Sequence, residues 1–262
     1  HEMIKMNDRN SKTKKQSGAC VLPCDFHTHT GFSDDCDVPM GQMLEGAIAH
    51  GIETLAITDH YDPGYPDPEF PFQLDFSRYL PALQAAQTKY RDKIEILAGM
   101  EIGILKGHFE EARRAVGSYP FDVIIGSFHC TRNDDMYRYD FAHADGPAEL
   151  EDFYTYMYEC LKEFQDFDIA GHFSILDRYI GTLYDYGAVE DQIDEILKLL
   201  INNGKAVIVI SHDRKFVDNI TTRTIEVTMG RIYDYKVNYS QYLQLRKERR
   251  EQQQKAYDEQ QK

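Results

Sequence analysis

Histidine and glutamate side chains recur at one kind of position, directly after short apolar runs that are typical of buried strands. The segments at these positions are His27-Thr28-His29, Asp59-His60, Gly99-Met100-Glu101, Ser127-Phe128-His129 and Gly171-His172. Because the carboxyl ends of parallel strands meet on one rim of a barrel, these side chains are expected to converge there. Imidazole nitrogens mixed with carboxylate oxygens suit Zn, Mn or Fe better than Mg or Ca, which prefer oxygen ligands alone. The pattern therefore predicts a metal site.

The spacing within the first segment supports this prediction. His27 and His29 are two residues apart, so on a strand both side chains leave from the same face and can hold one ion. Asp35 follows in the loop, with Asp34 and Asp37 as alternatives. Ligands of this kind can hold two ions about 3.5–4 Å apart, which activate a bridging hydroxide and neutralise a phosphoryl oxygen. A single histidine after a strand is most often a hydrogen-bonded loop residue, but five such coincidences favour a metal site.

Strands alternating with amphipathic helices must position these residues. The apolar runs predict strands over 21–26, 54–58, 94–98, 121–125 and 167–170, and the helical periodicity predicts helices over 40–50, 76–90, 109–117, 148–164 and 191–201. This alternation predicts an α/β fold with a parallel sheet or barrel. After residue 205 the composition changes to a strand over 206–210, a hairpin over 221–235 and a polar helix from 238 onward.

Charge and composition exclude several classes of function. The chain has 262 residues and a formal net charge of −15, and residues 20–205 carry 34 acidic and 13 basic side chains. That middle region would repel a polyanion, so nucleic-acid binding by it is not expected. No apolar run approaches the roughly 20 residues that span a bilayer, and no secretory segment is apparent, so a cytoplasmic protein without membrane contact is expected. Residues 1–19 are expected to be a disordered leader, and the five cysteines to be reduced thiols.

Taken together, the motifs resemble a known family. Asp25-Phe26-His27-Thr28-His29-Thr30, Phe32-Ser33-Asp34-Asp35, Thr58-Asp59-His60, Gly99-Met100-Glu101, Ser127-Phe128-His129 and Gly171-His172-Phe173 are similar to the PHP (polymerase and histidinol phosphatase) superfamily, in particular its stand-alone histidinol-phosphatase branch. The resemblance implies a distorted (β/α)7-type barrel over about 20–205, up to three divalent ions (Zn, Mn or Fe) and hydrolysis of a small phosphorylated substrate, L-histidinol phosphate. It implies these metal ligands: His27, His29, Asp35, His60, Glu101, His129 and His172.

The same resemblance assigns further roles. Glu101 and Asp35 are expected to take part in catalysis as well as in metal binding. Arg178, just beyond His172, is a candidate phosphate contact because a guanidinium group matches a phosphate face bidentately; a surface arginine without function is an equal alternative. PHP domains also occur as modules of DNA polymerases, which leaves a polynucleotide substrate as an alternative that the acidic middle region disfavours.

One motif of that family is absent. The family ends its site with a late Asp-x-His, whereas this chain has Ser211-His212-Asp213. Adjacent residues on a strand point to opposite faces, so at most one of His212 and Asp213 could reach the site, and His212 is the candidate ligand. The barrel is therefore expected to be incomplete and the activity impaired.

Residues 206–262 resemble a different family. The run Val207-Ile208-Val209-Ile210-Ser211-His212-Asp213 and the segments that follow it are similar to the switch-histidine strand and linker of F-subfamily ABC ATPases. The chain has no G-x-x-x-x-G-K-[ST] loop, so ATP hydrolysis is not expected. The domains are thus expected to be a 1–19 leader, a 20–205 phosphatase domain and a foreign 206–262 segment. The alternative function is a ribosome-associated fragment or binding module, with RNA or the ribosome as a partner of the tail.

Overall fold

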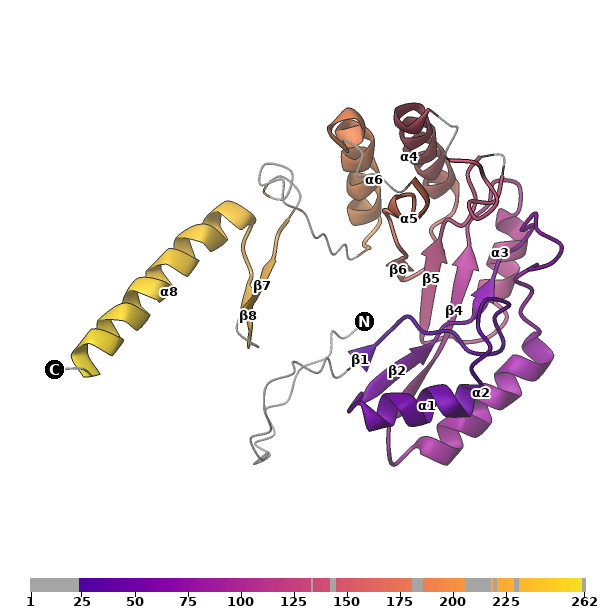
Figure 1. The fold of residues 1–262 in the computed structure, drawn as a ribbon, viewed down its shortest axis with the longest axis horizontal. Helices are drawn as coiled ribbons and strands as arrows, with labels where there is room; N and C mark the ends of the chain where they lie inside the picture. The colour runs from indigo at the N-terminus through magenta and orange to yellow at the C-terminus, as the bar shows by residue number, and fades with distance from the viewer. Residues whose placement is uncertain are drawn as a thin grey trace.

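Parallel strands form a curled sheet that makes half a barrel. The computed structural model describes residues 24–132, 134–141, 145–180, 186–205, 218, 221–228 and 231–260. The hydrogen-bonded strand order is β1 (Cys24–Asp25), β2 (Thr54–Ile57), β4 (Glu95–Gly103), β5 (Val123–Ser127) and β6 (Ile169–Ala170), as Figure 1 shows. A short strand, β3 (His60–Tyr61), pairs with β4 beyond the end of β2. All pairs in this sheet are parallel, so the carboxyl ends of the strands share one rim.

Helices connect the strands and contribute buried apolar residues to one common core. They are α1 (Met40–Ala49), α2 (Phe76–Tyr90), α3 (Phe109–Val116), α4 (Gly146–Glu163), the short α5 (Asp177–Ile180), the 3₁₀ turn η1 (Tyr186–Val189) and α6 (Glu190–Asn202). Helix α2 is capped by Asp75, whose carboxylate accepts a hydrogen bond from the amide of Ser77 at 3.0 Å, as expected of an N-cap aspartate. The helices over 40–50, 76–90, 109–117, 148–164 and 191–201 were predicted within two residues at each end.

The prediction that Glu101 follows the end of its strand is wrong. Strand β4 continues to Gly103, and Glu101 lies within it, in register with His60 of β3. The reason is that β3 supplies a second backbone partner to β4, which extends the strand beyond the apolar run that predicted it. The predicted strand over 206–210 and the leader over 1–19 lie outside the described residues.

Tyr79 of α2 joins the helix to the two strands beneath it. Its side chain is fully buried, and its hydroxyl lies 2.9 Å from the carbonyl oxygen of Ile57 and 2.8 Å from that of Gly99. Ile57 and Gly99 belong to β2 and β4, so this contact is made where the strands approach the rim. Burial further raises the pKa of Tyr79, which keeps the hydroxyl protonated and able to donate.

We expect Tyr79→Phe to lower the free energy of unfolding by about 1–2 kcal/mol, because a buried hydrogen bond is lost and the carbonyl oxygens stay buried. Urea unfolding of the purified chain measures this loss. Tyr137→Phe is the matched control, since the Tyr137 side chain is 76% exposed and its hydroxyl reaches water. Equal stabilities of the two variants would show that the Tyr79 hydroxyl contributes nothing.

The C-terminal segment forms a hairpin and a long helix. Strands β7 (Thr224–Thr228) and β8 (Arg231–Tyr235) are antiparallel, and α8 (Tyr239–Gln260) follows them. The predictions of a hairpin over 221–235 and of a helix from 238 onward are thus confirmed. The carboxylate of Glu226, 7% exposed, binds Arg246 at 2.9 Å and Arg249 at 2.8 Å. These ion pairs hold α8 against β7.

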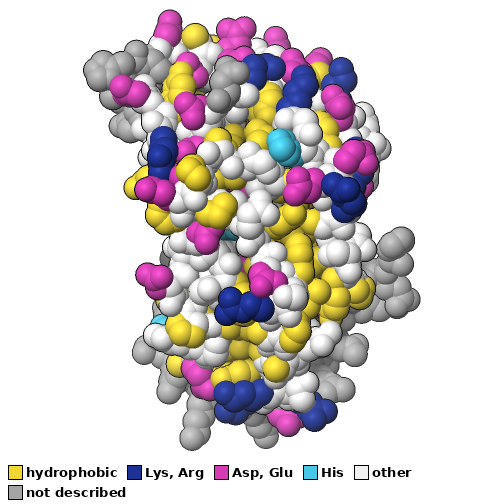
Figure 2. Space-filling model, turned by 90° about the vertical axis from the view of Figure 1, so that its right-hand side faces the viewer, with side chains coloured by type: hydrophobic (Ala, Val, Ile, Leu, Met, Phe, Trp, Pro, Cys, Tyr) yellow, Lys and Arg dark blue, Asp and Glu magenta, His cyan; other side chains and the backbone are white. Residues whose placement is uncertain are grey.

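The surface and the cysteines agree with the composition. On the face drawn in Figure 2, acidic and basic side chains are interspersed around a strip of hydrophobic ones. Within the described ranges, no helix combines the length and apolar character needed to cross a membrane. Cys24, Cys36, Cys130 and Cys160 are free thiols, as expected.

Candidate metal centre

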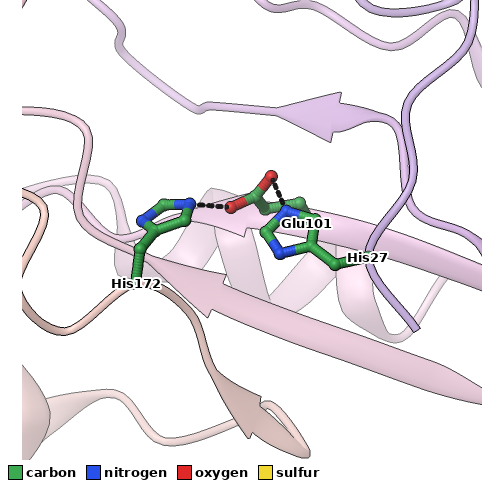
Figure 3. Close-up of side chains that lie close together, drawn as sticks. All are labelled: His27, Glu101 and His172. Carbon is green, nitrogen blue, oxygen red and sulfur yellow. Dashed lines mark hydrogen bonds and ion pairs between the residues drawn. The ribbon is translucent and has the colours of Figure 1, made fainter. Parts of the chain in front are cut away.

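Glu101 lies at the centre of the site. Its side chain is fully buried, and Figure 3 shows His27 and His172 approaching its carboxylate from opposite sides. The Nε2 atoms of these two histidines lie 2.9 Å from Oε2 and Oε1 of Glu101 respectively. Nε2 of His29 lies 3.3 Å from Oε2, and Nε2 of His129 lies 3.3 Å from Oε1. One carboxylate therefore joins imidazoles that come from three separate loops.

The loop after β1 carries two of these imidazoles and is tied to the neighbouring strand. The amide of Thr28 donates to the hydroxyl oxygen of Thr58 at 3.0 Å, and the hydroxyl of Thr28 donates to the carbonyl of Ala56 at 2.6 Å. Thr28 thus points toward β2, while His27 and His29 on either side of it point together toward Glu101. The alternation expected of extended chain is confirmed at this place.

Asp59 organises the next part of the same loop. Its buried carboxylate accepts hydrogen bonds from the amide of Thr30 at 2.5 Å, the hydroxyl of Thr30 at 2.8 Å and the hydroxyl of Ser33 at 3.0 Å. The Ser33 hydroxyl oxygen in turn accepts from the amide of His60 at 2.8 Å. Burial raises the pKa of Asp59, although these hydrogen bonds oppose the shift. Asp59 therefore fixes the loop to the segment that carries His60.

His60 joins the loop to the centre. Its ring stacks on the ring of His29 at 4.4 Å between centroids, and its Nδ1 lies 3.4 Å from Oε2 of Glu101. Its Nε2 lies 3.6 Å from Oδ2 of Asp35, whose side chain is 46% exposed. Of the acidic alternatives in the loop, Asp34 is engaged elsewhere, because its carboxylate accepts from the amide of Phe72 at 2.7 Å.

Asp62 is a carboxylate of the centre that the motifs did not reveal. It is 3% exposed, and its Oδ2 lies 2.5 Å from Nδ1 of His129. Its Oδ1 lies 3.6 Å from Nδ1 of His60. The spacing in the sequence does indicate it. Asp62 follows His60 by two residues, so in extended chain both side chains lie on the same face, just as those of His27 and His29 do.

The two buried carboxylates set the electrostatics of the centre. Burial disfavours the charged form of Glu101, yet hydrogen bonds from His129, His172 and His27 hold its pKa well below the usual range. Burial likewise opposes charge on Asp62, but the charge of His129 lowers the pKa of Asp62. His129 responds in the opposite sense: burial alone would lower its pKa, and Asp62 and Glu101 raise it to about 9. The centre therefore attracts positive charge.

The donor atoms fit metal ions. In the part of the chain that the structure describes, buried atoms without a hydrogen bond include Nδ1 of His29, His60 and His172 and Oε1 of Glu101. Leaving such atoms unsatisfied is costly, and cations would satisfy them. Three groups of side chains each place ligand atoms within 4.8 Å of one another: His27, Glu101 and His172; His29, His60 and Glu101; His60, Asp62 and His129.

Burial lowers the pKa of His29 to about 4, with the charge of His60 as a second cause. The imidazole of His29 is therefore neutral, as a metal ligand must be.

The structure brings together most of the residues that the sequence singled out. All five histidines named after strands lie within 3.4 Å of a Glu101 oxygen, and Asp35 lies next to His60. Arg178 is exposed on α5, with its guanidinium carbon 6.0 Å from the ring centroid of Tyr179. His212 lies outside the described residues.

Comparison with known proteins gives two separate regions of similarity. A histidinol-phosphatase of Lactococcus lactis subsp. lactis is 29% identical over 193 residues, which cover 70% of this chain and 69% of that protein. A crystal structure of histidinol phosphate phosphatase from the same organism, complexed with Zn, L-histidinol and phosphate, has a TM-score of 0.63 at 26% identity and covers 70% of this chain and 71% of that one. ABC transporter F family member 2 of Arabidopsis thaliana is 38% identical over 72 residues, which cover 28% of this chain and 11% of that protein.

Family models agree with this division. A model described as ABC transporter matches residues 225–262, which contain most of the hairpin and all of α8. A model described as PHP domain matches residues 25–212, the region that contains nearly all of the curled sheet and the candidate metal centre. Since that match covers well over half of the chain, the chain belongs to the PHP domain family.

Proposed function

We propose that this chain is a metal-dependent phosphomonoesterase that hydrolyses L-histidinol phosphate to L-histidinol and phosphate. The observation that carries the proposal is the buried carboxylate of Glu101 with five imidazoles within 3.4 Å of its oxygens. Support for the substrate comes from the histidinol phosphatases that the chain resembles over 70% of its length. The donor set favours Zn, Mn or Fe over the oxygen-seeking Mg and Ca.

Seven residues would hold the divalent ions: His27, His29, Asp35, His60, Glu101, His129 and His172. When bound, such ions lower the pKa of a water ligand and neutralise charge on phosphoryl oxygens. We infer that up to three ions bind, since five imidazoles and two carboxylates supply the ligand atoms and candidate groups share Glu101 and His60 between them.

The chain's own residues define where the substrate enters. Glu101 is fully buried, whereas the side chains of His27, His172 and Asp35 are 32%, 29% and 46% exposed. The phosphate group would therefore reach the centre from the side on which these three residues lie. Arg178 on α5, a few residues beyond His172, is our candidate for a bidentate contact to the phosphate.

Phosphate release from L-histidinol phosphate tests the proposal. The full chain is loaded with Zn²⁺, Mn²⁺ or Fe²⁺ in parallel, and bound metal is measured in the same samples. Release of phosphate by at least one loaded form, with loss of activity after chelation, is the expected result. A folded chain that binds metal and releases no phosphate would overturn the assignment of the substrate.

The missing late motif gives a prediction of its own. We expect the double substitution Ser211→Asp and Asp213→His, which restores the order Asp-x-His, to raise kcat/KM by roughly 10–100-fold, the range over which partners of a metal site change affinity or activity. Steady-state kinetics of the two chains measure the gain. Ser211→Asp alone is the matched control, and no gain from the double substitution would place the defect elsewhere.

We further propose that residues 20–205 form the phosphatase domain and residues 206–262 a separate ABC-F-like segment. The ion pairs of α8 support this, since Arg246 and Arg249 bind Glu226 of the hairpin. We expect Glu226→Ala to destabilise the hairpin–helix unit by about 2 kcal/mol, because two arginines lose their shared, largely buried carboxylate. Circular dichroism of α8 on heating measures this effect. Phosphatase activity and metal content should stay unchanged, and a fall in either would contradict the division.

A further inference from the structure

The residues around Asp62 leave space for its side chain and hold its backbone in place. It follows β3, is 3% exposed, and its amide donates to the carbonyl of Phe72 at 2.9 Å. Opposite it, on β4, is Gly103, where an added Cβ would lie 2.5 Å from Cγ of Asp62. Any side chain at that position would displace the carboxylate, so the glycine makes the room that Asp62 occupies.

The segment before α2 contributes a second constraint. Phe72 has a φ of 45°, a left-handed backbone conformation that is unfavourable for a bulky residue by about 1–3 kcal/mol. Its amide donates to Asp34, its carbonyl accepts from Asp62, and its ring lies 4.8 Å from that of His60. A strained residue in contact with Asp62 and His60 indicates that the position of Asp62 is maintained at some energetic cost.

The carboxylate of Asp62 faces one nitrogen of His129, and the other nitrogen faces the metal centre. Nδ1 of His129 lies 2.5 Å from Oδ2 of Asp62, while Nε2 lies 3.3 Å from Oε1 of Glu101. A histidine that donates its Nδ1 proton to a carboxylate has a fixed ring orientation and presents the lone pair of Nε2 to a cation. Such a partner also increases the basicity of the ligand nitrogen.

We infer that Asp62 is a positioning residue of the metal centre, which fixes the tautomer and orientation of His129 without binding an ion itself. The inference rests on the proposed metal centre but not on the proposed substrate. It places Asp62 beside the seven ligands as an eighth side chain that the centre requires.

Asp62→Asn tests the inference, because it keeps the shape of the side chain and removes its charge. We expect Zn²⁺ affinity, measured by competition with a chromogenic chelator, to fall by 10–100-fold, while the number of Zn²⁺ ions bound at saturation stays the same. We expect NMR of the metal-free parent chain to show a strongly shifted ring N–H proton of His129, and we expect this signal to be absent from the Asp62→Asn chain. Neither measurement requires a substrate, so both remain informative if L-histidinol phosphate is not hydrolysed.

Asp67→Asn is the matched control. Asp67 is also a buried carboxylate of the loop after β3, but it binds Arg138 at 2.7 Å and the amide of Glu69. Its substitution should leave the Zn²⁺ affinity and the His129 proton unchanged, which separates positioning from a general loss of stability. A saturation stoichiometry that drops by one ion in Asp62→Asn would overturn the inference by making Asp62 a ligand. Unchanged affinity would overturn it as well.

Discussion

Glu101→Gln is expected to lower kcat/KM for L-histidinol phosphate by about 10³-fold or more, with loss of bound metal. The carboxamide has the shape of the carboxylate but lacks its charge and one acceptor oxygen, so two imidazoles that now lie 2.9 Å from carboxylate oxygens would face a neutral group. A bound ion contributes several kcal/mol to stabilising charge in the transition state, and each ~1.4 kcal/mol is a factor of ten in rate. Metal analysis and steady-state kinetics measure the two effects.

Glu95→Gln is the matched control for this substitution. Glu95 begins the same strand, is exposed, and accepts from the hydroxyl of Thr54 at 2.9 Å, far along β4 from the rim. Its substitution should leave metal content and kcat/KM unchanged. Retention of full metal content by Glu101→Gln would contradict the central position assigned to this carboxylate.

Removal of the metal is expected to lower stability as well as activity. Without metal, only the neighbouring imidazoles balance the charge of the buried carboxylates Glu101 and Asp62. Several buried atoms of these side chains then lack a hydrogen bond. A ligand that binds only the folded chain stabilises it by about 4 kcal/mol at 1,000 times its dissociation constant. We therefore expect Tm to fall by several degrees after dialysis against a chelator and to return when Zn²⁺ is added.

The Glu101→Gln chain provides the internal check on this prediction. Its Tm should respond much less to chelator or to added Zn²⁺, because its centre no longer holds the metal. An equal thermal shift in both chains would locate the stabilising ions at another site.

The local rules of secondary structure explain why so many elements were predicted from the sequence. Helix α2 occupies the predicted residues 76–90 because its apolar period and the N-cap Asp75 both act within one or two turns. Except for β4, the strands that the apolar runs predicted end within two residues of the expected position, because apolar runs stop where the polar rim begins. The end of β4 was misplaced because β3, which extends it, is supplied by a distant part of the chain.

Asp59 and Asp62 show what such patterns miss. Asp59 is a buried carboxylate that accepts hydrogen bonds from Thr30 and Ser33, which lie 29 and 26 residues away in the sequence. Asp62 lies 67 residues from its partner His129, and no local pattern relates the two. Both roles depend on which donors fold against each carboxylate.

Short, local patterns of the sequence were enough to identify the histidines that follow the strands and the similarity to a second family near the C-terminus, because each pattern lies within a few neighbouring residues. Which atoms meet depends on the folded chain: Glu101 faces five imidazoles at once, Asp35 rather than Asp34 approaches His60, and Asp62 binds His129. The physical reason is that distances of about 3 Å between side chains far apart in sequence follow from the curvature and register of the whole sheet, which no single segment specifies.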